Sequence, residues 1–313
     1  MLENENTIYK MQSISHYIKH PNIIAIGIFT RTCKWLPDKP YLQILYFLHF
    51  GKFINLRNPH TISEKLQWLK LYDQRPEYAQ MVDKYAAKQF AAAKIGAEHI
   101  IPTFGVWDRS KDIEFDNLPD SFVLKTTHSA GCSGVVICKN KNDLNIKKAI
   151  RKLNKSLKTD LSKSMREWPY KNVPHRIIAE KYMEDEYGEL RDYKFYCYNG
   201  EVKYVQADVG RFSDHHQNIY DTHWHLLPIS FGYPQDCHII DKPKNFESML
   251  KIAETLAAGI PHIRVDLYNV NGNIYFGELT FFPTSGYKYI RPNELNYKFG
   301  DWINLPSQII YAK

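Results

Sequence analysis

A segment near the C-terminus, RVDLYNVNGNIYFGELT, constrains the fold more than any other part of the chain. Polar and apolar residues alternate on both sides of an Asn-Gly pair, which is typical of two antiparallel strands joined by a tight turn. Because successive strand residues point to opposite faces, Arg264 and Asp266 share one face. A loop centred on Gly272 places Asp266 opposite Glu278. It also places Arg264 opposite Thr280, whereas a two-residue turn shifts this register by one position.

Two carboxylates on one face of a hairpin favour a metal site. Facing carboxylates repel each other unless a cation lies between them. Magnesium in nucleotide enzymes is held by one or two carboxylates, and phosphates supply further ligands. Asp266 and Glu278 are therefore candidate Mg²⁺ ligands, although a solvated charged face is equally compatible with the pattern. An EF-hand is excluded, because Leu267 occupies its first ligand position and the flanks are strand-like.

Composition and termini favour a cytoplasmic protein of about two domains. The chain has 313 residues, of which 44% are hydrophobic. Its five cysteines form no C-x-x-C pair, which favours reduced thiols. The polar opening MLENENTIYK is unlike a secretory signal, and the longest apolar runs are far shorter than the roughly 20 residues that span a bilayer.

Residues 1–60 carry seven Lys or Arg against three Asp or Glu, interleaved with aromatic residues. Short helices are predicted here, broken at Pro21, Pro37, Pro40 and Pro59. A basic helical cap packed on the main domain is the favoured interpretation. Contact with an anionic membrane surface, on its inner face, is the alternative. No recognised nucleic-acid motif is present, so no nucleic-acid partner is expected.

Strands, helices and hairpins alternate after this segment, so the class is α+β or mixed α/β. Thr61 or Ser63 can cap a helix, and MVDKYAAKQFAAAKIG predicts a second helix ending at Gly96. LPDSFVLKTTHSAGCSGVVICKN predicts a strand, a glycine loop and a strand. Four regions are proposed: 1–60, 61–115, 116–185 and 186–313.

Several charged residues stand at the ends of strands or inside them. Lys125 precedes the loop THSAGCSG and could neutralise phosphate, although the loop is not a P-loop and its glycines also suit an ordinary turn. Lys84 is a second candidate cation or a solvated helix lysine. Glu180 lies in an apolar strand and needs a partner, either a basic side chain or an adenine amino group. Asp192 and Lys194 share a face and suit a ribose and a phosphate, or form an ordinary salt bridge.

Read in order, several motifs resemble the ATP-grasp superfamily, and more closely its TupA-like branch. They are NPHTISEKLQWLKLYDQRPE, DKYAAK, FVLKTTHSAG, IIAEKYMED, DYKFYCYNG and GELTFFPTSG. The resemblance covers roughly residues 40–305. It implies an ATP-grasp fold in which two α+β subdomains enclose the nucleotide, with a lid in 116–185 and a helical N-terminal extension. The branch is associated with synthesis of bacterial surface polysaccharide and teichuronopeptide.

The resemblance also implies roles for individual residues, with ATP and Mg²⁺ as cofactors. Asp192 faces the ribose in this reading, with Glu189 as a rival, and Thr280 replaces an Asn that is common in the superfamily. Arg264 and Lys125 are the implied catalytic residues, with Arg264 facing the reacting carboxyl group. The implied nucleotide-binding residues are Lys84, Lys125, Ser129, Gly131, Ser133, Gly134, Glu180, Lys181, Tyr182, Asp192 and Lys194. The implied metal ligands are Asp266, Glu278 and Thr280.

The reaction that the resemblance implies is ATP-dependent carboxylate–amine ligation through an acyl phosphate. The expected product is an amino acid or similar amine joined to a sugar acid of a capsule, O-antigen or teichuronopeptide. A sugar kinase would use the same ATP site, whereas a glycosyltransferase is disfavoured because the chain has no D-x-D. A non-catalytic nucleotide-binding scaffold would not need Arg264 or Glu278. The acceptor is free, nucleotide-linked or lipid-linked.

Overall fold

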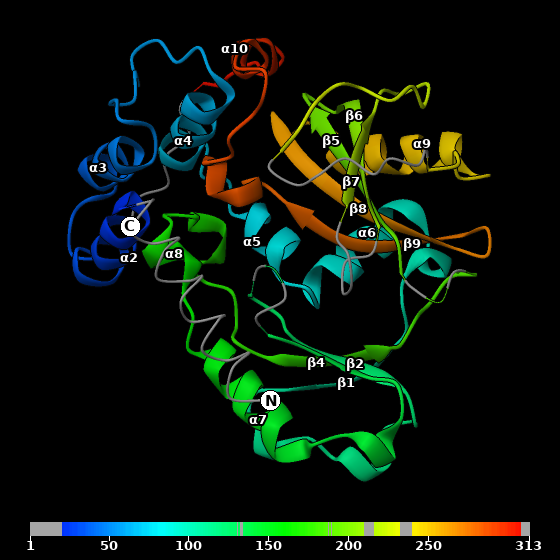
Figure 1. Ribbon diagram of the computed structural model, residues 1–313. Coiled ribbons are helices and arrows are strands. Elements are labelled where there is room, and N and C mark those ends of the chain that lie inside the picture. The colour runs from blue at the N-terminus through cyan, green and yellow to red at the C-terminus, as the bar shows by residue number, and fades with distance from the viewer. Residues whose placement is uncertain are drawn as a thin grey trace, which may run out of the picture.

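The protein forms two antiparallel sheets with helices around and between them (Figure 1). This computed structural model describes residues 21–129, 131, 134–186, 188, 190–209, 216–231 and 240–307. The α+β class expected from the sequence is confirmed. None of the helices in these ranges is long and apolar enough to cross a membrane.

The larger sheet has five strands within the described residues, in the order β7-β6-β5-β8-β9. The helix α9 (Phe246–Ala257) packs on one face of this sheet, against β5, β6 and β8. Apolar residues of α9 and of alternate strand positions form the main hydrophobic core, as period-two strands and a one-sided helix require. The strands are β5 (Asp192–Tyr198), β6 (Glu201–Val209), β7 (His216–Tyr220), β8 (His262–Val270) and β9 (Asn273–Thr280).

The smaller sheet has four strands in the order β1-β4-β2-β3. The helix α7 (Ile146–Leu157) covers the face that points away from the larger sheet, and Leu153 enters a separate core there. β1 lies in region 61–115, yet it pairs with β4 of region 116–185. The strands are β1 (Thr103–Trp107), β2 (Phe122–Thr126), β3 (Val135–Cys138) and β4 (Ile177–Lys181).

Two short helices lie between the sheets, α5 (Glu77–Val82) and α6 (Ala86–Ile95) (Figure 1). The sequence predicts one continuous helix here, and that prediction is wrong at Asp83. The buried Asp83 carboxylate accepts hydrogen bonds from the Tyr85 backbone N–H at 2.9 Å and from Arg176 at 2.7 Å. An Asp that binds nearby backbone N–H groups competes with helical hydrogen bonding and ends the first helix.

The N-terminal helices form a layer beside the larger sheet. Thr61 caps α4 through a capping box with Glu64, so the first of the two expected caps is used. Pro21 begins α2 and Pro37 precedes α3, whereas Pro40 does not break a helix. Pro40 lies in the first turn of α3, where the missing N–H has no intrahelical partner to lose. The N-terminal layer consists of α2 (Pro21–Thr32), α3 (Asp38–Phe50) and α4 (Ile62–Tyr72). The remaining helices are α8 (Leu161–Ser164) and α10 (Glu294–Asp301).

Candidate functional site

A cavity of about 540 Å³ lies between the two sheets. This volume is within the range of small-molecule sites. Its apolar wall comes from both sheets and would suit a flat ring, and its charged residues gather where β2 and β4 meet the hairpin of β8 and β9. The apolar lining residues are Ile101, Val123, Val135, Ile137, Met183, Leu190 and Tyr268. The charged lining residues are Lys84, Lys125, Lys139, Glu180, Lys181, Asp192, Asp266 and Glu278.

The β8–β9 hairpin has the facing pairs that the sequence suggests. Its turn has two residues, and close to the turn the strands follow the register of such a turn. A bulge at Gly277 then shifts the register by one position, so Asp266 lies opposite Glu278 and Arg264 lies opposite Thr280. From the sequence, a two-residue turn and a register with facing carboxylates excluded each other. The bulge allows both to occur in the same hairpin.

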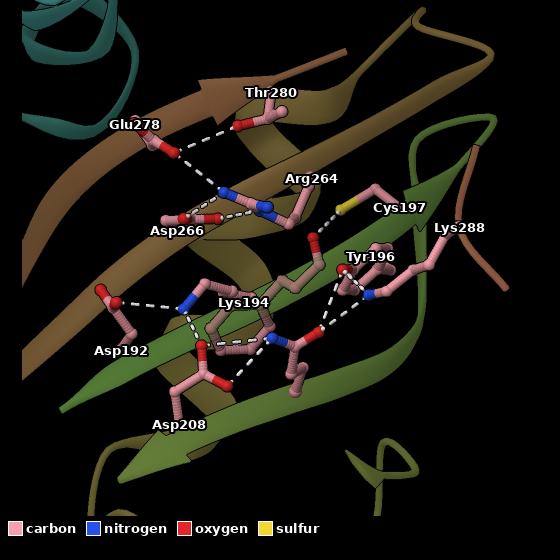
Figure 2. A network of polar contacts seen from close by, with 12 residues as sticks. Asp192, Lys194, Tyr196, Cys197, Asp208, Arg264, Asp266, Glu278, Thr280 and Lys288 are labelled. Carbon is pink, nitrogen blue, oxygen red and sulfur yellow. Dashed lines mark hydrogen bonds and ion pairs between the residues drawn. The ribbon is translucent and has the colours of Figure 1, made fainter. Parts of the chain in front are cut away.

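Arg264 joins the two carboxylates of the hairpin (Figure 2). Its Nε and Nη2 atoms donate to Asp266 at 2.6 and 2.7 Å, and Nη2 also donates to Glu278 at 2.8 Å. The Thr280 hydroxyl donates to the same Glu278 oxygen at 3.3 Å. Burial alone would lower the pKa of Arg264, but Asp266, Tyr196 and Glu278 together outweigh it and raise that pKa well above its usual value.

Asp266 and Glu278 fit a divalent cation. Burial raises the pKa of Asp266 to about 6. Arg264 lowers this pKa and the charge of Glu278 raises it, but burial is the largest effect. A further positive charge beside Asp266 would therefore stabilise its ionised form. The described residues contain no cluster of three or more His, Cys, Asp or Glu, so a metal held by Asp266 and Glu278 would need further ligands from phosphates or water. Thr280 is not part of the described cavity wall.

Lys84 reaches the hairpin from the break between α5 and α6. Its Nζ lies 3.4 Å from a Glu278 oxygen and donates to the Ser129 carbonyl at 2.5 Å. Its backbone N–H donates to the Thr127 carbonyl at 2.9 Å, which ties the break to the smaller sheet. Lys84 is thus neither a solvated helix lysine nor part of a regular helix, and it bridges the two sheets at the cavity.

Lys125 and Glu180 of the smaller sheet form a buried charged cluster with Lys88. Glu180 accepts from Lys125 at 2.5 Å and from Lys88 at 2.7 Å. Burial opposes ionisation of Glu180, but the two lysines outweigh burial and lower its pKa to about 2. The basic partner that the sequence left open for Glu180 is therefore present. Contact of Glu180 with an adenine stays a prediction.

The glycine loop is placed partly at the cavity. Gly131 lines the cavity, with a φ of 64° that glycine adopts readily. A side chain at Gly134 would collide with the hydroxyls of Ser156 and Thr126, so this position requires glycine for close packing. Ser129 is buried and donates to the Thr126 carbonyl at 3.1 Å. Ser133 and the rival ribose ligand Glu189 lie outside the described residues.

Asp192 and Lys194 form the salt bridge that was one of the two alternatives. Lys194 lies 3.0 Å from Asp192 and also contacts Asp208 (Figure 2). Gln206 and Gln217 each donate to Asp208 at 3.0 Å. Asp192 lines the cavity, whereas Lys194 lies behind it in this network. Lys181 and Tyr182 line the cavity, and their contact with the base stays a prediction.

Sequence reasoning missed three residues of this region. Lys88 follows Lys84 by four positions and faces the cavity cluster, so helical spacing after the break could have indicated it. Asp208 pairs with Asp192 across the β5–β6 hairpin, but counting back from its Asn-Gly turn gives Ala207 instead, because a bulge near Tyr196 shifts the register. Lys288 lies in a loop and no local pattern marks it.

The cavity lies between two lobes that each combine helices with an antiparallel sheet, and comparison with known families identifies the class of protein. The TupA-like ATP-grasp family matches residues 64–304, and the chain belongs to this family. No curated protein sequence matches the chain.

Solved structures with some similarity include three ATP-grasp proteins. D-alanine–D-alanine ligase from Bacillus anthracis, complexed with ATP, has 14% identity and a TM-score of 0.39, covering 65% of this chain and 54% of that one. N5-carboxyaminoimidazole synthetase from Staphylococcus aureus has 14% identity and a TM-score of 0.39, covering 65% and 45%. D-alanyl-alanine synthetase A from Vibrio cholerae has 12% identity and a TM-score of 0.42, covering 85% and 70%. The chain thus spans about half the length of the first two proteins.

Proposed function

We propose that this protein is an ATP-dependent carboxylate–amine ligase that acts through an acyl phosphate. The observation that carries the proposal is the position of Arg264 between Asp266 and Glu278, two carboxylates at the end of a cavity that is also lined by Lys84 and Lys125. A guanidinium held there is preorganised to stabilise negative charge on a reacting carboxyl group. The family and the ligases among the similar structures support this reading.

The chemistry proceeds in two displacements. A carboxylate oxygen takes the γ-phosphoryl group of ATP, an O–P bond forms, and ADP leaves. An amine nitrogen then attacks the acyl carbon, the C–N bond forms, the C–O bond breaks, and phosphate leaves. Lys84 and Lys125 are proposed to bind the phosphates, and Arg264 the carboxyl oxygen. Positioning and cations carry the catalysis, so no side-chain nucleophile is required.

The nucleotide is proposed to lie with its base against the apolar wall of the cavity. The base would contact Glu180, Lys181 and Tyr182, and the ribose would contact Asp192. Asp266 and Glu278 hold Mg²⁺, which when bound neutralises charge on the transferred phosphoryl group. Thr280 orients the Glu278 carboxylate, or reaches the metal or its water.

Trapping with hydroxylamine tests the reaction. With ATP, Mg²⁺ and a uronic-acid acceptor, the protein is expected to release ADP rather than AMP, and hydroxylamine is expected to capture a hydroxamate. The hydroxamate should require Mg²⁺ and disappear in Lys125→Ala. Glu278→Gln should abolish it without unfolding, because the amide has the same shape without the charge. Thr280→Ala is the matched control and is expected to retain measurable turnover.

Two results would replace the proposal by another enzyme class. A stable sugar phosphate without hydroxamate would identify a sugar kinase. Release of UDP from a UDP-sugar without ATP would identify a glycosyltransferase.

The substrates are proposed to be a sugar acid of a bacterial surface polysaccharide and an amino acid or similar amine. The N-terminal layer is proposed to rest on the anionic inner face of the membrane, where lipid-linked glycans are assembled. Exposed apolar side chains support this placement, since Ile28 is 57% exposed and Trp35 is 78% exposed. The basic residues Lys34 and Lys39 are exposed beside them. Mass spectrometry of the native glycan, with and without this protein, tests the choice of substrate.

A further inference from the structure

Lys288 differs from the other lysines of this region in the groups that its amine contacts. Its Nζ lies 3.0 Å from the Tyr196 hydroxyl and 3.4 Å from the Gln206 carbonyl oxygen. It also lies 3.6 Å from the centre of the Phe231 ring. Within the described ranges no carboxylate lies within ion-pair distance of this amine. Its partners are neutral.

The other lysines of the region are held by carboxylates or by backbone carbonyls. Lys125 pairs with Glu180 at 2.5 Å. Lys194 contacts two aspartates, one of them at 3.0 Å. Lys70, which is also buried, donates to two backbone carbonyls, at 2.8 and 2.9 Å. Lys288 is therefore distinguished by its neutral partners together with its position beside the hairpin.

Lys288 lies next to Arg264 but on the side away from the carboxylates. Figure 2 shows Asp266 and Lys288 on opposite sides of Arg264. Tyr196 connects them, because it pairs with Arg264 across β5 and β8 and accepts from Lys288. The nucleotide cavity ends at Asp266 and Glu278. Lys288 lines a separate small hollow of about 20 Å³ together with Tyr196 and His262, so an amine that meets a carboxyl group held by Arg264 from this side would have Lys288 beside it.

An amine must lose a proton to become an amide, and the proposed site otherwise offers only committed side chains for it. We propose that Lys288 accepts a proton from the ammonium form of the amine substrate, so that the neutral nitrogen can attack the acyl carbon. This proposal rests on the ligase function above. The first proton moves from the ammonium nitrogen to Lys288 Nζ, the nitrogen forms the C–N bond, and the acyl C–O bond breaks with phosphate as leaving group. The second proton of the nitrogen leaves with the phosphate.

The surroundings of Lys288 favour the neutral amine that this role requires. Burial and, after it, the positive charge of Arg264 lower the pKa of Lys288 well below its usual 10.5. Asp208 opposes this shift and Lys194 adds to it. The titratable and charged groups that face Lys288 are Lys194 and Tyr196 of β5, Tyr204 and Asp208 of β6, and His262, Arg264 and Asp266 of β8.

Competitive acetylation measures the protonation of Lys288 directly and needs no substrate. The full-length protein is treated with trace acetic anhydride across a pH series, and each lysine is quantified by mass spectrometry. Lys288 is half-buried and remains partly accessible to the reagent. Its labelling is expected to rise at a lower pH than that of the exposed lysines. A labelling curve that coincides with theirs would overturn the proposal.

Variants of Lys288 test its role with two nucleophiles in the same assay. Hydroxylamine is largely unprotonated at neutral pH, whereas methylamine is almost wholly an ammonium ion. In Lys288→Met the ratio of methylamide to hydroxamate should fall by roughly 100-fold, the usual size of a general-base effect. The methylamide rate of this variant should then recover as the pH is raised. The exposed Lys298→Met is the matched control and should leave the ratio unchanged.

Lys288→Arg separates proton transfer from charge. Arginine keeps the positive charge and cannot accept a proton at neutral pH. If Lys288→Arg restores the wild-type ratio, Lys288 binds an anion and the proposal is wrong. An equal loss with both nucleophiles would likewise overturn it. Absence of any hydroxamate from the wild-type protein would contradict the ligase function itself, which distinguishes the two failures.

Discussion

At the scale of single residues, the site is organised by charges that satisfy one another across the two sheets. Glu180 is held by Lys88 and Lys125, and Glu278 by Arg264 and Lys84. Buried charges are tolerated in a fold only when they are paired in this way. The same pairing would hold Lys84 and Lys125 in place for the phosphates that we propose they bind. Breaking one pair should therefore be visible in stability as well as in binding.

Glu180→Gln should lower the free energy of unfolding by about 3 kcal/mol at pH 7, from 1.36 kcal/mol for each pKa unit between 4.5 and about 2. The folded pKa is depressed, so this contribution is present above about pH 5 and is lost as the pH falls toward 2. Urea unfolding of both proteins at pH 7, 5 and 3 measures the difference. Exposed Glu98→Gln is the control and should change little. A difference that does not depend on pH would contradict this explanation.

At the scale of elements, the break between α5 and α6 places a lysine at the cavity. A continuous helix would direct Lys84 elsewhere, because helical residues follow a fixed angular step. The Asp83 side chain maintains the break through Tyr85 and Arg176. The β8–β9 bulge acts similarly, since it brings two carboxylates to face each other despite a two-residue turn. Both devices are local departures from regular structure that serve the site.

Asp83→Ala should weaken Mg²⁺–ATP binding by about tenfold and destabilise the protein by about 2–3 kcal/mol. The substitution removes the acceptor of the Tyr85 backbone N–H and the carboxylate that pairs with Arg176. Asp83→Asn is the matched variant. It keeps an acceptor for the Tyr85 N–H without the charge, and it should retain more of the ATP affinity. Calorimetric titration with ATP measures both. Unchanged affinity in Asp83→Ala would show that the break does not position Lys84.

At the scale of the whole molecule, the N-terminal layer is part of the folded protein. Tyr41, Leu42, Leu45 and Tyr46 of α3 are buried and form a core with Leu71 of α4. Tyr287, one residue before Lys288, packs into the same core. Deleting this layer would uncover apolar surface, so its membrane role is better tested by changing exposed charges.

Replacing Lys34, Lys39 and Lys52 by Gln should weaken binding to anionic vesicles by about 3 kcal/mol, from about 1 kcal/mol for each basic residue near the surface. All three side chains are exposed, so the fold should persist. Co-sedimentation with phosphatidylserine vesicles at low and high salt measures the effect, and neutral phosphatidylcholine vesicles are the control. Equal partition of the two proteins, or binding that salt does not weaken, would contradict membrane docking.

The hairpins, most helices, the shared face of Arg264 and Asp266, and the family could all be predicted from the amino-acid sequence. These are local properties, because strand alternation, helix caps and Asn-Gly turns are readable within a few residues. The register of β8 and β9 needed the structure, since a bulge at Gly277 leaves no decisive local mark.

The contacts between side chains that lie far apart in the chain are known from the tertiary structure alone. Lys84, Lys125 and Glu278 converge from three separate segments, and a pairing over such distances has no periodic signal. The same holds for Lys88 on Glu180. The lysines beside Glu180 then lower its pKa to about 2, against the effect of burial. Desolvation and neighbouring charge depend on what packs around a residue, and the chain order alone does not specify that packing.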